Sequence, residues 1–104
     1  MMVARWSIDA RFGYKAEVVD ALQRWMREIG SQIGWKAENV RILTGSVGTR
    51  EATVQAEILI RDLAELNAAW DRLATLDTHK QWSQDLEPFV VSGSPRWEVL
   101  RVVG

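Results

Sequence analysis

Residues 3–12 alternate between apolar and polar side chains, and this two-residue period constrains the fold more than any other feature of the sequence. One side of the segment carries Ala4, Trp6, Ile8, Ala10 and Phe12, and the other carries Arg5, Ser7, Asp9 and Arg11. Successive side chains of a strand point to opposite faces, so the pattern predicts a strand with one apolar and one polar face. The apolar face then requires a second layer to cover it.

Three further strands and a long helix are predicted from the same kind of pattern. Residues 53–60 alternate again, and residues 40–47 precede them across a glycine-containing turn at 48–51, which indicates a hairpin. Residues 96–103 form the last expected strand. Between the first two strands, residues 15–33 carry apolar side chains at helical spacing, which predicts an amphipathic helix ending near Gly34.

The segment from Asp62 to Val91 predicts a helix that is interrupted and then restarts. Asp62 followed by Glu65 has the spacing of a capping box, and an apolar stripe follows it. The stripe consists of Leu63, Leu66, Trp70 and Leu73. The helical phase then slips near residues 76–78. Thr78 and Gln81 repeat the capping spacing, so we expect a kink and a short second helix over residues 79–87.

The resulting order, β-α-β-β-α-β, predicts one ferredoxin-like α+β domain over residues 1–104, with two helices covering one face of a four-stranded antiparallel sheet. The second helix is expected to be kinked. The polar face of the sheet either lies in water or meets a second copy in a homodimer. Apolar residues on that otherwise exposed side favour the homodimer, and the candidate interface residues are Arg5, Asp9, Arg11 and Glu57.

Composition excludes several classes of function. The net charge of −1 argues against a nucleic-acid surface, since phosphate binding needs a basic excess. The absence of cysteine and the presence of one histidine argue against a transition-metal site. No apolar run is long enough to span a membrane, and no signal peptide is evident, so we expect a cytoplasmic protein without a membrane partner.

The only histidine, His79, lies in the expected short helix on the same face as Trp82. Its ordinary pKa is near neutrality, so it is the candidate catalytic acid or base, or an axial ligand of haem. The alternative is a structural histidine bonded to a neighbouring group. Six tryptophans are unusual for 104 residues. They fill the core or line a ligand pocket. The candidate pocket residues are Trp6, Tyr14, Trp25, Trp70, His79 and Trp82.

This element order, together with the segment HKQWSQDLEPFV after the second helix, resembles the dimeric α+β barrel superfamily. That group includes NIPSNAP-like proteins, stress-responsive A/B barrel domains and antibiotic-biosynthesis-type monooxygenases. The resemblance implies that two protomers join their sheets face to face, with a pocket inside each protomer. Haem-degrading members use an asparagine on the first strand, where this sequence has Ser7. The monooxygenases need no metal or flavin, so we expect no cofactor.

Three functional hypotheses follow. The first is a small homodimeric protein of the α+β barrel type whose aromatic pocket binds a small apolar or aromatic molecule. The second is a cofactor-independent enzyme of the monooxygenase type, in which His79 acts as acid or base. The third is a non-catalytic structural or interaction module whose tryptophans fill a dry core.

Overall fold

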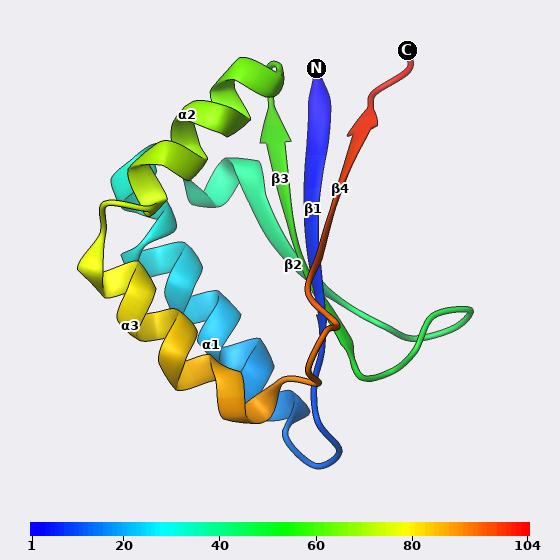
Figure 1. Cartoon of the computed structure of the whole chain (residues 1–104). Coiled ribbons are helices and arrows are strands. Elements are labelled where there is room, and N and C mark those ends of the chain that lie inside the picture. Colours follow the sequence, from blue (N-terminus) through cyan, green and yellow to red (C-terminus); the bar gives the residue numbers. More distant parts are fainter.

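The computed structural model describes residues 1–104 and has two layers, a four-stranded antiparallel sheet and a set of helices on one of its faces (Figure 1). The strands are β1 (Met2–Asp9), β2 (Val40–Thr44), β3 (Thr53–Ile60) and β4 (Arg96–Arg101), in the spatial order β2-β3-β1-β4. The helices are α1 (Lys15–Glu28), α2 (Leu63–Leu73) and α3 (Asp77–Leu86). This is the ferredoxin-like α+β fold predicted from the sequence.

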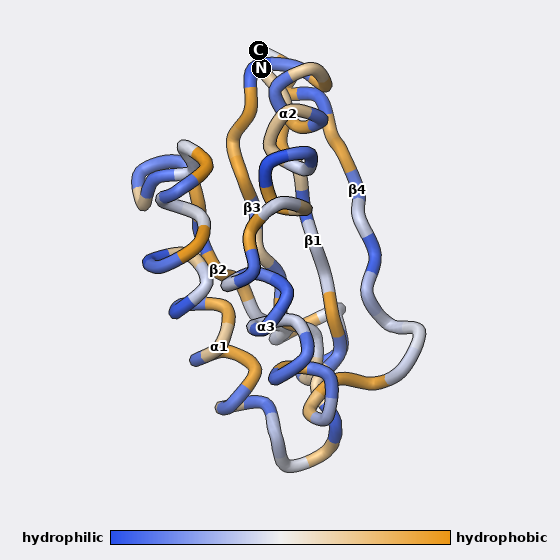
Figure 2. Tube along the Cα trace, turned by 60° about the vertical axis from the view of Figure 1, so that its left-hand side comes forward, coloured by the Kyte–Doolittle hydropathy of each residue, from blue (hydrophilic) through white to orange (hydrophobic).

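The apolar sides of β1 and β3 form the centre of the core, as their alternation predicted. Ile8 pairs with Val54 and Ala4 pairs with Ile58, and all four side chains are buried. From the helical layer, α1 contributes a buried stripe, and Figure 2 shows hydrophobic and hydrophilic residues alternating along its turns. The stripe and the short turns that follow it bury Val18, Leu22, Trp25, Ile29 and Ile33.

The break in the second helical segment is also present. Asp62 caps α2, with its carboxylate accepting the backbone N–H of Glu65 at 2.9 Å. The chain then takes an extended conformation at Leu76 (φ −92°, ψ 113°), from which α3 starts. The expected cap at Thr78 is wrong: α3 begins earlier, at Asp77, and its N-cap is Leu76, with no side-chain hydrogen bond. Leu76 packs against the core, so packing rather than capping sets this start.

Several elements end earlier than their sequence patterns indicated. β1 ends at Asp9, because the chain turns after Arg11, whose N–H donates to the carbonyl of Phe89 at 2.8 Å. Phe12, expected on the apolar face, is therefore fully exposed. The long helix ends at Glu28, and a 3-10 helix over Gly30–Ile33 completes it. The last strand likewise ends at Arg101 rather than at residue 103.

β2 ends at Thr44, three residues before the expected end, because the hairpin loop begins at Gly45. The N–H of Gly45 donates to the carbonyl of Thr53 at 2.9 Å. A Cβ atom on Gly45 would lie 1.8 Å from the carbonyl oxygen of Arg50, so only glycine fits at this close approach of the two backbones. The loop therefore spans residues 45–52 and is longer than the four-residue turn that the sequence suggested.

Candidate functional site

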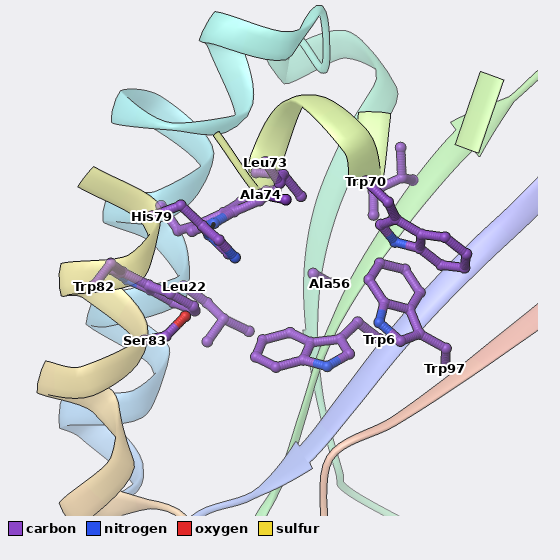
Figure 3. Close-up of a pocket in the computed structure, with 12 residues that line it drawn as sticks. Trp6, Leu22, Ala56, Trp70, Leu73, Ala74, His79, Trp82, Ser83 and Trp97 are labelled. Atoms are coloured by element: carbon purple, nitrogen blue, oxygen red, sulfur yellow. Dashed lines mark hydrogen bonds between the residues drawn. The ribbon is translucent and has the colours of Figure 1, made fainter. Parts of the chain in front are cut away.

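A cavity of about 310 Å³ lies between the inner face of the sheet and the helices α1, α2 and α3 (Figure 3). Its lining is almost entirely apolar and carries no charged side chain. The lining residues are Trp6, Leu22, Trp25, Ala56, Ile58, Trp70, Leu73, Ala74, His79, Trp82, Ser83 and Trp97. Five of the six tryptophans thus surround one space, which we call the tryptophan cavity.

The register of the strands determines which side chains line this space. Trp6 on β1 is paired with Ala56 on β3 and with Trp97 on β4, so a small residue and a second indole flank it. Trp97 in turn meets Trp70 of α2 edge-on at a ring-centroid distance of 5.4 Å. Trp70 and Trp97 are 37% and 39% exposed, so this pair marks the mouth of the cavity. Trp25 and Trp82, at 8% and 7%, form its inner wall.

His79 is held in the wall by two tryptophans. The indole N–H of Trp25 donates to Nδ1 of His79 at 3.0 Å, and the imidazole stacks on Trp82 at a centroid distance of 5.9 Å. Trp82 is itself fixed, since its N–H donates to the carbonyl of Ala21 at 2.9 Å. Burial lowers the pKa of His79 below its usual value of 6.5. The imidazole is therefore neutral at pH 7.

The structure brings together five of the six residues expected to line a pocket: Trp6, Trp25, Trp70, His79 and Trp82. Tyr14 lies elsewhere. It is the N-cap residue of α1 and packs against Phe89 at a centroid distance of 5.2 Å. Sequence reasoning did not assign Trp97 to the cavity. The alternation of Trp97 with Val99 predicts the face of the strand on which Trp97 lies. The position of Trp97 beside Trp6, however, depends on the β1–β4 register.

The face of the sheet away from the helices carries a row of alternating charges, which we call the charged row. It runs across the sheet through Arg41, Glu57, Arg5 and Glu98, which are aligned by the strand register. Glu57 is only 7% exposed and forms ion pairs with Arg5 at 3.0 Å and Arg41 at 2.6 Å. Burial raises the pKa of Glu57, but hydrogen bonds and charge from Arg41 and Arg5 outweigh burial and lower it.

Two of the residues assigned to a dimer interface have other local partners. Asp9 is buried, accepts the hydroxyl of Thr53 at 2.7 Å, and forms longer ion pairs with Arg50 and Arg96. Arg11 lies beyond the end of β1 and donates its Nε–H to the carbonyl of Val90 at 3.1 Å. Arg5, Glu57 and Asp9 therefore share the outer face of the sheet, whereas Arg11 is bound to a neighbouring loop.

The structure contains no group of three or more histidine, cysteine, aspartate or glutamate side chains arranged to hold a metal ion. None of its helices combines the length and the apolar character needed to cross a membrane.

Comparison with known proteins defines the class of fold. No protein-family model matches the sequence, and no curated protein matches it significantly. Among solved structures, a NIPSNAP family protein from Agrobacterium tumefaciens has a TM-score of 0.79 at 14% identity, over 98% of this chain and 92% of that one. An uncharacterized NIPSNAP domain protein from Burkholderia xenovorans has a TM-score of 0.72 at 18% identity, over 100% and 96%.

Monooxygenase-like structures are also similar, with somewhat lower TM-scores. A putative antibiotic biosynthesis monooxygenase from Caulobacter crescentus has a TM-score of 0.70 at 16% identity, covering 99% of this chain and 90% of that one. The chain thus has the ferredoxin-like α+β fold of the NIPSNAP and monooxygenase-like proteins, as the resemblance predicted. At these identities the likeness concerns the fold, and function has to be argued from the cavity.

Proposed function

We propose that the protein binds a small aromatic or apolar molecule in the tryptophan cavity, and that it does so as a homodimer. The observation that carries the proposal is the convergence of five tryptophans and His79 on one uncharged space, with the partly exposed Trp70 and Trp97 at its rim. Indole rings offer large, flat, apolar surfaces to an aromatic ligand. A structural module with a dry core would instead be expected to fill this space with its own side chains.

The size of the cavity limits the ligand. At about 310 Å³, it lies at the lower end of the range of small-molecule sites, which is roughly 300–1,000 Å³. It therefore suits one small ring system or a short apolar chain better than a large cofactor. The absence of a charged lining residue favours a ligand whose buried part is uncharged, because an unpaired charge is costly to bury.

A fluorescence titration of the tryptophans tests this proposal. Quinols and short fatty acids are titrated into the protein and into two variants on α3, and a flavin and haem serve as ligands too large for the cavity. Ser83 lines the cavity, so Ser83→Phe fills part of it, whereas Gln84→Phe places the same ring on an exposed neighbouring position outside the lining. We expect saturable quenching in the wild type and in Gln84→Phe, and weaker binding in Ser83→Phe. Equal binding by all three proteins would place the ligand elsewhere.

The proposed homodimer uses the outer face of the sheet. Leu59 and Leu100 both flank Val3 in the strand register, and they expose about two fifths of their surface beside the charged row. An apolar strip next to paired charges is typical of a surface that meets a partner. The fold neighbours of the α+β barrel type support a second copy of this chain as that partner.

Light scattering at micromolar concentration tests the dimer. We expect a mass about twice that of the 11.9 kDa chain, and a return to one chain in Leu100→Glu, which places a charge in the apolar strip. Leu63→Glu is the matched control, because Leu63 is also exposed but lies at the start of α2 on the helical layer. A wild-type mass of one chain would refute the dimer.

Catalysis of the monooxygenase type is a second candidate, favoured by the position of His79 in the wall of the uncharged cavity. A neutral imidazole in an apolar cavity can hydrogen-bond to the oxygen of a bound phenol and stabilise the negative charge that develops on it. The test is oxygen consumption with a quinol or a polyketide-like phenol. Turnover that disappears in His79→Ala but persists in Gln84→Phe would support it, and binding without oxygen uptake would leave the protein as a binding module.

A further inference from the structure

The hydrogen bond between Trp25 and His79 determines which nitrogen of the imidazole carries the proton. An indole N–H can only donate, so the Nδ1 atom 3.0 Å from it must offer its lone pair. A neutral imidazole has one N–H, which then resides on Nε2. The other tautomer and the imidazolium would each set a second N–H against the indole N–H. Both forms therefore lose this bond.

This assignment restricts what His79 can do in the cavity. A general base that acts through Nε2, or a ligand that binds haem iron through Nε2, needs the lone pair of that atom, and its Nδ1–H must then find an acceptor. Trp25 supplies no acceptor. The residues present therefore do not fit a histidine-ligated haem. His79 can donate a hydrogen bond from Nε2–H, but it cannot act as a general base there.

Most of the other polar side-chain groups of the lining are also hydrogen-bond donors. Trp25 and Trp82 use their indole N–H groups within the protein. Trp6, Trp70 and Trp97 have no partner in the protein for theirs, and an indole nitrogen accepts no hydrogen bond. Nδ1 of His79 is already occupied by Trp25. The hydroxyl of Ser83 is therefore the one remaining side-chain group of the lining that can accept a hydrogen bond. The side chains of the lining thus carry more hydrogen-bond donors than acceptors.

We propose that Trp25 fixes His79 as a neutral donor through Nε2–H, so that the tryptophan cavity selects small aromatic ligands that carry an acceptor oxygen, such as aryl ketones or quinones. The choice of ligand class depends on the proposed binding function, whereas the tautomer of His79 does not. Figure 3 shows the imidazole reaching from α3 toward the interior of the cavity beside Trp6, where such an oxygen would meet it. Trp25 acts as a positioning residue.

The tautomer is measured without any ligand. His79 is the only histidine, so a long-range ¹H–¹⁵N spectrum of the labelled protein contains one imidazole. We expect a protonated, pyrrole-like Nε2 and a pyridine-like Nδ1, and a mixture of the two tautomers in Trp25→Phe. Trp35→Phe is the matched control, because Trp35 packs against Trp25 at 5.9 Å without bonding to His79. A pyridine-like Nε2 in the wild type would overturn the inference.

The ligand class is tested with acetophenone and ethylbenzene, which have similar shapes and differ in the carbonyl oxygen. Binding is followed by the indole N–H signals of the six tryptophans. We expect acetophenone to bind roughly fivefold more tightly, as one neutral hydrogen bond implies, and the preference to disappear in His79→Phe. Equal affinities in the wild type would overturn the selection of an acceptor. Failure of both probes to bind, with Nε2–H present, would contradict the proposed function while the tautomer stands.

Discussion

Burial of His79 should make the protein less stable as the pH falls, and His79→Gln should remove that loss. The pKa of His79 is lowered in the folded protein, so the unfolded chain binds the proton first, below about pH 6.5. The free energy of unfolding then falls with pH until the folded pKa is reached. One fully linked proton gives a slope of at most about 1.4 kcal/mol per pH unit. Partial exposure of the ring makes the real slope smaller.

Urea unfolding followed by tryptophan fluorescence, from neutral pH down to about pH 5, measures this slope. In this range no other histidine titrates, and the pKa of Glu57 lies below the range because it is lowered from 4.5. Glutamine does not titrate, and its side-chain oxygen can still accept from Trp25. We therefore expect a flatter profile in the variant. Parallel profiles of the two proteins, or a wild type that gains stability on acidification, would refute the reasoning.

Three further predictions concern stability. The pKa of Glu57 is lowered in the folded protein, so its ionised carboxylate stabilises the fold above about pH 4.5, and this contribution is lost as the pH falls through the folded pKa. Glu57→Gln should therefore make the free energy of unfolding depend less on pH below 4.5. Gly45→Ala should lower the melting temperature markedly, since the new Cβ would overlap the carbonyl oxygen of Arg50; an unchanged melting curve would contradict the tight hairpin. Leu66→Ala, at a site 1% exposed, should cost roughly 2–5 kcal/mol in urea unfolding, whereas Leu63→Ala, at 51%, should cost much less.

The fold could be predicted because its main constraints are local and periodic. The alternation in β1 and β3 and the stripe in α1 each fixed an element and its buried face. Boundaries were harder, because they depend on contacts between segments that are distant in sequence. β1 ends at Asp9 because Arg11 bonds to Phe89, and α3 starts at Asp77 because Leu76 packs into the core. Neither contact has a signature in the residues around it.

The candidate site was predicted in its composition but not in its chemistry. His79 and Trp82 share a helical face, and Trp6 and Trp25 point into one layer, so their convergence follows from periodicity. The bond from Trp25 to His79 joins residues 54 positions apart and depends on how α1 packs beside α3. The position of Trp97 beside Trp6 depends on register in the same way. Sequence alone therefore suggested an acid or base, whereas we infer a donor from the bond between Trp25 and His79.

The charged row also has a direction, because it starts with Arg41 on β2 and ends with Glu98 on β4. If an identical row is turned end for end and laid over it, each arginine meets a glutamate; in the same direction, like charges meet. In a face-to-face pair of sheets, a two-fold axis parallel to the strands produces the first arrangement, and an axis along the row produces the second. The order of four side chains thus disfavours one of two symmetric docking orientations by repulsion, and so selects the geometry of a partner independently of its affinity.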